Sequence, residues 1–137
     1  MKRPLNIGYL FLLTSLFFES MWLGHLTSAE YVLGRTFGFE RAYPWSHWFH
    51  VVSGLLVCLL GFFATSTVLL DRPWSKQLAA VFCLVAIVFI SARALLTQPP
   101  EWWFAAESCF LPIGVLGFLA LSWFGSRLDP HKVGQLS

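Results

Sequence analysis

Four long apolar segments, each the length of a membrane-spanning helix, dominate this sequence. About 20 consecutive apolar residues in a helix cross the hydrocarbon core of a bilayer, and the chain has four runs of that length, at residues 5–26, 47–70, 77–96 and 102–124. Only 12% of the residues are charged, whereas soluble domains have about 25%. The sequence therefore predicts an all-α, integral membrane four-helix transmembrane bundle.

Short breaks separate these segments and leave no room for a second domain. They fall at Asp71–Pro73, Gln98–Pro100 and Gly125–Arg127, where Pro, Gly and charged residues stop a helix. The longest connection, residues 27–46, is too short for a core of its own, and its many aromatic residues favour the membrane surface. We expect a single transmembrane domain over residues 1–137, with 27–46 as an outer loop that forms a half-ordered cap or a short interfacial helix.

The composition also limits the partners of the chain. Such an apolar sequence excludes a nucleic-acid-binding module, a disordered tail and an ordinary cytosolic enzyme. The expected partners are the lipid bilayer and either other membrane-protein subunits or further copies of the chain, with no nucleic acid. Cys58, Cys83 and Cys109 each lie inside an apolar run, so we expect them in the core rather than in a disulfide framework or a metal motif.

Lys and Arg residues concentrate at one end of the predicted bundle. Of the nine, those that precede the first segment, separate the second from the third or follow the fourth are Lys2, Arg3, Arg72, Lys76, Arg127 and Lys132. Because basic residues in short loops stay on the cytoplasmic side, we expect both termini to be cytoplasmic in a bacterial inner (plasma) membrane. A cleaved signal peptide is a competing interpretation, since small Thr27 and Ala29 follow the first apolar run, but bulky Trp22 and His25 argue against it.

Three ionisable residues, Glu19, Arg93 and Glu107, lie within the predicted segments rather than beside them. A charge at bilayer depth costs about 2.5 to 3.5 kcal/mol on insertion scales, so such residues usually face the bundle interior and pair. Counted inward at about 1.5 Å per residue, all three and His50 lie at a similar depth near the outer boundary. The glutamates outside these segments are expected to be solvated loop charges: Glu30, Glu40 and Glu101.

We therefore predict one buried polar cluster in the outer leaflet, formed by Glu19, His50, Arg93 and Glu107. Trp22 and Trp48 are expected in the same layer, and His47 and His25 at the mouth of the cluster. One guanidinium holds one carboxylate in a bidentate fork, which leaves the second carboxylate near His50. The cluster is either an ion-pair lock that fixes the helix register or the polar floor of a pocket that opens outward beneath Tyr43–Trp48.

Two kinds of ligand suit such a cluster. His47 and His50 lie at positions i and i+3 on one helical face, and with His25 or a glutamate oxygen they offer ligands for Zn, Cu or non-haem Fe. The HxxH spacing lacks the specificity of the HExxH zinc motif, so it does not by itself specify a metal. A quinone or another amphipathic molecule is the alternative, because a histidine, a carboxylate, Trp22 and Trp48 can hold a polar ring near the interface.

Two stretches carry a resemblance to a known family. The first segment ends YLFLLTSLFFESMWLG, and the glycine-rich second segment reads VVSGLLVCLLGFF. With the plan of the chain over residues 5–125, they resemble the DoxX-like group of small four-helix membrane proteins. The resemblance implies a membrane subunit that accompanies oxidoreductases, in some relatives a quinone-linked sulfur-oxidising enzyme. The chain departs from that group in its longer aromatic first loop and in having His50 where an acidic residue is usual, so no functional residue is carried over.

The expected function is a small accessory subunit of a redox or respiratory-type membrane complex, in which the outer cluster stabilises the bundle or lines a quinone or metal site. The alternative is a self-contained membrane enzyme or small-molecule carrier whose pocket is formed by Glu19, His50, Arg93 and Glu107. The sequence contains no nucleophile–base pair and no glycine-rich phosphate loop, so hydrolysis and phosphoryl transfer have no residues to carry them.

Overall fold

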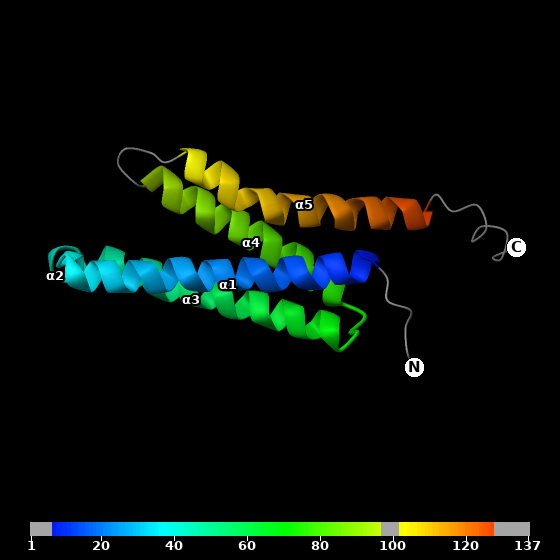
Figure 1. The fold of residues 1–137 in the computed structure, drawn as a ribbon, viewed down its shortest axis with the longest axis horizontal. Coiled ribbons are helices and arrows are strands. Elements are labelled where there is room, and N and C mark those ends of the chain that lie inside the picture. Colours follow the sequence, from blue (N-terminus) through cyan, green and yellow to red (C-terminus); the bar gives the residue numbers. More distant parts are fainter. Residues whose placement is uncertain (1–6, 97–101, 128–137) are drawn as a thin grey trace, which may run out of the picture.

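The computed structural model describes residues 7–96 and 102–127, and the regular elements in those ranges are all helices. They follow one another as α1 (Ile7–Thr36), α2 (Phe39–Ala42), α3 (Pro44–Leu69), α4 (Ser75–Leu96) and α5 (Trp102–Arg127) (Figure 1). Apart from the short α2, each contains a stretch that is long and apolar enough to cross a membrane. This confirms the predicted all-α architecture, with four helices that are long and apolar enough to span a membrane.

The four long helices form two antiparallel pairs. α1 and α3 run side by side along most of their length, and α4 and α5 form a second pair that packs against the first (Figure 1). α1 begins and α5 ends at one end of the bundle, where α3 also turns into α4, whereas α2 lies at the opposite end (Figure 1). We call this opposite end the α2 end.

α1 is longer than the apolar pattern predicts, and its length corrects the expected outer loop 27–46. The helix continues to Thr36, ten residues past the predicted end at 26. The hydroxyl groups in this stretch are satisfied within the helix, since they donate to carbonyls one turn back, as Thr27 does to Leu23 O at 2.8 Å. The helix ends only before Gly38, whose φ of 76° favours glycine. The lower hydropathy after residue 26 therefore indicates where the chain leaves the apolar layer, not where the helix ends.

The bounds of the other long helices lie within three residues of the predicted ones. α3 begins at Pro44, because proline is well suited to the first turn of a helix, where its missing N–H has no helical partner to lose. Residues 39–42 form the short helix α2 between α1 and α3.

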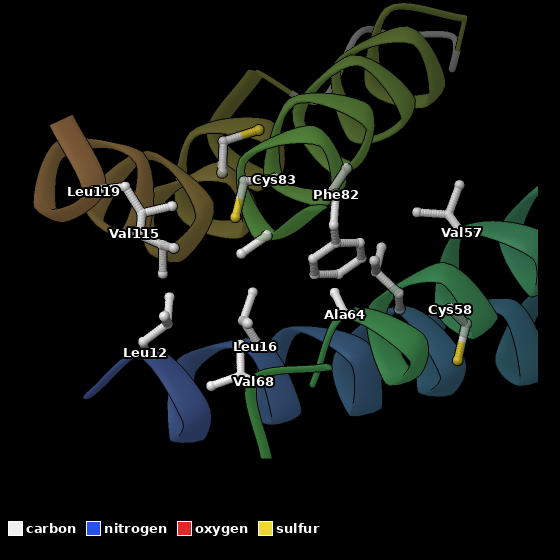
Figure 2. Packing of buried hydrophobic residues seen from close by; sticks show 14 of the residues in the cluster. Leu12, Leu16, Val57, Cys58, Ala64, Val68, Phe82, Cys83, Val115 and Leu119 are labelled. Carbon is white, nitrogen blue, oxygen red and sulfur yellow. The ribbon is translucent and has the colours of Figure 1, made fainter. Parts of the chain in front are cut away.

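The apolar core lies where the four long helices meet. Leu12 and Leu16 of α1 face Val115 and Leu119 of α5, with the fully buried ring of Phe82 beside them (Figure 2). Toward lipid the same helices expose large apolar side chains such as those on the outer faces of α3 and α5. A bundle with apolar side chains both inside and outside is expected in a bilayer, where lipid replaces water around it.

α1 and α3 approach each other closely because small residues line their contact. A Cβ added at Gly61 would overlap the hydroxyl of Ser20 on α1 and lie 2.6 Å from the ring of Phe82 on α4. In the same manner, a Cβ added at Gly34 of α1 would overlap the ring of His47 on α3. Membrane helices associate through such packing, because apolar side chains gain little by leaving lipid for a protein neighbour.

We predict that Gly61→Ala lowers the free energy of unfolding by about 1 to 3 kcal/mol, because the added methyl group overfills a contact that is already closed. The matched control is Gly114→Ala, since nothing lies within 4 Å of a Cβ at that position in α5. The control is expected to stabilise the protein by up to about 1 kcal/mol through its better helix propensity. Unfolding of both variants in detergent micelles measures the difference, and equal stabilities would show that the contact between α1 and α3 tolerates the methyl group.

Candidate functional site

A cleft of about 560 Å³ opens near the α2 end of the bundle. α1 forms one wall and the first turns of α3 form another, while α4 contributes a single residue. We call it the His50 cleft. It is lined by Leu26, Ala29, Glu30, Leu33, Gly34, Tyr43, Ser46, His47, His50 and Arg93.

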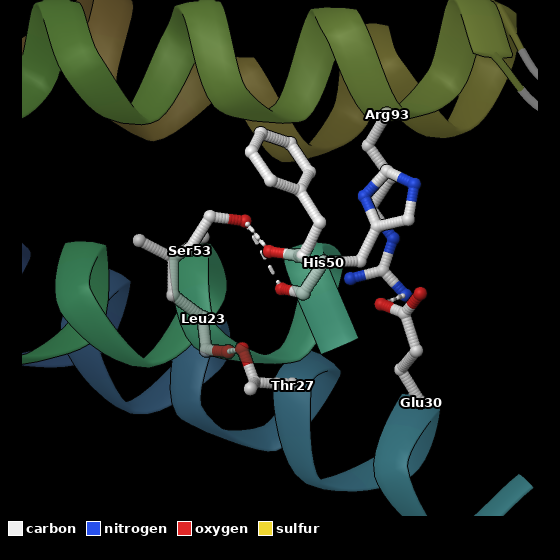
Figure 3. Close-up of polar contacts among 7 residues, drawn as sticks. Leu23, Thr27, Glu30, His50, Ser53 and Arg93 are labelled. Carbon is white, nitrogen blue, oxygen red and sulfur yellow. Dashed lines mark hydrogen bonds and ion pairs between the residues drawn. The ribbon is translucent and has the colours of Figure 1, made fainter. Parts of the chain in front are cut away.

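Arg93 of α4 forms an ion pair with Glu30 of α1 in this cleft. The guanidinium Nη2 lies 2.6 Å from the carboxylate Oε2, and the two side chains are only 23% and 20% exposed. His50 of α3 stands beside the pair, so three helices each bring one ionisable group to the same place (Figure 3). The expectation that Glu30 is a solvated loop charge is therefore wrong. α1 continues past residue 26 and carries Glu30 into the bundle.

Glu19 and Glu107 do not join Arg93 and His50. They line a separate pocket of about 330 Å³ between α1 and α5. The predicted depths were counted from a first helix that ended at residue 26, whereas α1 ends at Thr36. Glu30, rather than Glu19, consequently lies at the depth of Arg93. It is eleven residues, or about 16 Å, further along α1 than Glu19 is. We call the second site the Glu19 pocket, and its lining residues are Phe18, Glu19, Trp22, Glu107, Ser108 and Leu111.

The carboxylate of Glu19 occupies a position where an apolar side chain would pack. Leu12, Leu16 and Leu23 lie on the same face of α1 and are buried, and Glu19 between them is only 4% exposed. Within the part of the chain that the structure describes, its Oε1 atom accepts no hydrogen bond. A carboxylate at this depth costs about 2.5 to 3.5 kcal/mol if it is ionised, whereas Glu107 on the other wall is exposed.

The three histidines considered as metal ligands do not gather. His47 is buried between α1 and α3 with its ring 5.6 Å from that of Trp48, and His25 is exposed beside Trp22 on α1. His50 lines the cleft with His47, but His25 does not reach them. In residues 7–96 and 102–127, no group of three or more His, Cys, Asp or Glu side chains is placed to hold a metal ion.

The two tryptophans predicted beside the cluster lie in different places. Trp22 lines the Glu19 pocket. Trp48 packs at 6.2 Å between ring centroids from Tyr31, near the α2 end but outside the described lining of the His50 cleft. The aromatic side chain in that lining is Tyr43, the residue before α3.

An apolar groove of about 430 Å³ adjoins the His50 cleft between α3 and α4. His50 and Arg93 line both the cleft and the groove, and the groove's only other polar lining residue among those described is Ser53. The rest of its surface consists of apolar side chains: Phe49, Val57, Leu84, Val85, Val88, Phe89 and Ala92. The two hollows thus share His50 and Arg93, with ionisable side chains in the cleft and a mainly apolar lining along the groove.

Glu30 is the functional candidate that reasoning from the sequence missed, although the sequence contains a signal for it. Eleven residues make about three helical turns, so Glu30 returns to the face of α1 that carries Glu19. A helical projection continued past residue 26 would have placed both glutamates toward α3, α4 and α5 rather than toward solvent.

Comparison of the chain with protein-family models found no match, and neither the curated proteins nor the solved structures gave one. The function is therefore argued from the sites themselves.

We predict that Arg93→Gln or Glu30→Gln lowers the free energy of unfolding by about 1 to 3 kcal/mol, because each breaks a mostly buried ion pair by removing one of its charges. The double variant Glu30→Gln/Arg93→Gln is expected to lose less than the sum of the two, since it removes both charges. Unfolding in detergent measures all three. Arg35→Gln is the control, because Arg35 meets Glu40 at 3.6 Å on the surface and is 63% exposed, where a pair contributes less than about 1 kcal/mol. Strict additivity of the single variants would contradict the coupling.

Proposed function

We propose that this protein is a small accessory subunit of a redox or respiratory-type membrane complex, and that the His50 cleft holds the ring of a quinone or a similar amphipathic molecule. The observation that carries the proposal is that His50 and Arg93 line both a cleft with ionisable side chains and an apolar groove. A molecule with a polar ring and a long apolar tail has the same division along its length.

The polar part of the site offers what a quinone ring needs. Its carbonyl oxygens accept hydrogen bonds, and His50 and Arg93 carry N–H groups on two different helices. Tyr43 adds an aromatic ring with a hydroxyl group at the same end of the cleft. The ion pair with Glu30 holds the Arg93 side chain in one position, which favours a defined orientation of the ring.

The apolar part suits an isoprenoid tail. The groove between α3 and α4 faces outward, and Val88 and Phe49 on its sides are largely exposed. A tail that lies there would remain in contact with lipid while the ring sits in the cleft. Binding pockets commonly combine such an apolar lining with a few placed polar groups.

The subunit role rests on the outer surface of the bundle. Large apolar side chains are exposed on all four long helices, and surfaces of this kind contact lipid or the helices of a neighbouring chain.

We further propose that the protein lies in a bacterial inner membrane with both termini cytoplasmic, because of its Lys and Arg distribution, and that it is related to the DoxX-like group. Fluorescence of a green fluorescent protein fused after Ser137 tests the orientation.

We predict that the purified protein in nanodiscs binds a short-chain ubiquinone analogue saturably, and that His50→Ala weakens this binding by about tenfold, the equivalent of one hydrogen bond to a well-placed donor. Calorimetric titration measures the affinity. His25→Ala is the matched control, because His25 is an exposed histidine on α1 outside the described lining of the cleft.

Equal losses in His50→Ala and His25→Ala would contradict the assigned site, and failure of the wild-type protein to bind would contradict quinone binding altogether. The subunit role is tested separately by mass spectrometry of chains that co-purify in mild detergent. Recovery of the protein as a lone monomer would overturn it.

A further inference from the structure

The Glu19 pocket takes no part in the proposed quinone site and has a different chemistry. One turn of α1 and one turn of α5 face each other across it, and each contributes a glutamate, Glu19 and Glu107. Among the described residues that line it, none is a lysine, arginine or histidine. Two carboxylates therefore share a pocket without a basic side chain in its wall.

Glu19 is the residue that points to a ligand. Its side chain is 4% exposed and lines the pocket, yet in the described part of the chain its Oε1 atom has no hydrogen-bond donor. Buried polar atoms in native proteins nearly always have a hydrogen-bond partner. An atom without one in the protein can have a bound ion, a water molecule or a ligand as its partner. The missing partner of a carboxylate oxygen is a hydrogen-bond donor, and a positively charged donor suits it best.

A further acceptor lies on the opposite wall. Pro112 stands inside α5, four residues after Ser108. Because proline has no N–H, it cannot donate the usual helical hydrogen bond to the Ser108 carbonyl. Ser108 itself lines the pocket. Ser108, whose carbonyl lacks its usual helical donor, thus lines the pocket together with the two glutamates. A primary ammonium group has three N–H donors to offer to such acceptors.

The remaining lining favours an organic cation over a metal ion. Phe18 and Trp22 of α1 and Leu111 of α5 line the same pocket as the two glutamates, and aromatic rings attract cations through their faces. By contrast, residues 7–96 and 102–127 hold no group of three His, Cys, Asp or Glu side chains suited to a metal. Trp22 is 41% exposed and Phe18 is more so, which leaves the pocket open toward lipid.

We propose that the Glu19 pocket binds a lipophilic primary amine in its ammonium form, with the charged group between Glu19 and Glu107 and the apolar body against Phe18 and Trp22. The amine enters sideways from the bilayer between α1 and α5, whose contact is much smaller than that of α1 with α3. Further along the two helices, away from the α2 end, Phe11 of α1 and Phe118 of α5 meet edge to face with centroids 5.3 Å apart.

The test uses the full-length protein in phosphatidylcholine nanodiscs, which supply no primary amine. Titration calorimetry with 2-phenylethylammonium is expected to show saturable binding above that of empty nanodiscs, and the uncharged analogue 2-phenylethanol is expected to bind at least tenfold more weakly. Nanodiscs that contain phosphatidylethanolamine then distinguish the source of the amine. Competition assigns the site to a lipid headgroup, and its absence assigns it to a free amine.

Three variants locate the binding. Glu19→Gln keeps the shape of the side chain and is expected to weaken amine binding at least tenfold, and Glu107→Gln at the exposed rim is expected to weaken it several-fold. Glu40→Gln is the control, since Glu40 pairs with Arg35 away from the pocket. Thermal unfolding of each variant confirms that it is folded, and Glu107→Gln keeps the test decisive if Glu19→Gln does not fold.

Equal affinity for the amine and the alcohol would overturn the proposal, as would wild-type affinity in folded Glu19→Gln or Glu107→Gln. The His50→Ala variant is expected to bind the amine with unchanged affinity, because His50 lines the other site. Loss of quinone binding and loss of amine binding are therefore separate results.

Discussion

The close contact between α1 and α3 determines where the polar groups of this bundle meet. Glycines and small hydroxyl residues lie between the two backbones, so that Gly61 receives Ser20 and Gly34 receives the ring of His47. Such a contact has one register, because a shift along either helix would bring larger side chains together. With this register fixed, Glu30 and the start of α3 line the same cleft, and α4 needs to supply only Arg93 to complete the ion pair.

The two polar sites differ in how their charge is balanced. In the His50 cleft a carboxylate meets a guanidinium at 2.6 Å, so the chain neutralises its own charges there. In the Glu19 pocket the lining includes two glutamates, and the described lining contains no basic side chain. Burial of a charge is favourable only with a partner, and an imbalance of this kind requires a proton or a cation from outside the chain. The first site is thus suited to a neutral molecule and the second to a charged one.

The sequence predicts the helices better than it predicts the depth of the side chains on them. Four apolar runs identify the membrane-spanning helices, because hydropathy measures the property that a bilayer selects. The same measure misplaces the end of α1, since residues 27–36 are polar enough to leave the apolar layer but remain helical. Because of that single error, the sequence pattern places Glu19 at the depth of Arg93, although Glu19 lies at the depth of the core. For the same reason it misses the role of Glu30. Pairing of side chains between helices depends on how far along each helix they lie, and composition does not determine that position.

Most of the polar residues that the sequence singles out line one of the two sites, but their grouping required the structure. Glu19 with Trp22 and Glu107 are neighbours across α1 and α5, and His50 with Arg93 are neighbours across α3 and α4. Helical phase alone gives the direction of each side chain from its own axis. It does not tell which of three neighbouring helices that direction meets.

The unequal lengths of the helices carry a consequence for the surrounding bilayer. α1 has 30 residues and α4 has 22, so they are about 45 Å and 33 Å long, against a hydrocarbon thickness of about 30 Å. The length of α4 exceeds this thickness only slightly, whereas α1 must either tilt or project into the headgroup region. Projection at the α2 end would set the mouth of the His50 cleft among phosphates and glycerol esters, within reach of molecules that partition at the lipid–water boundary.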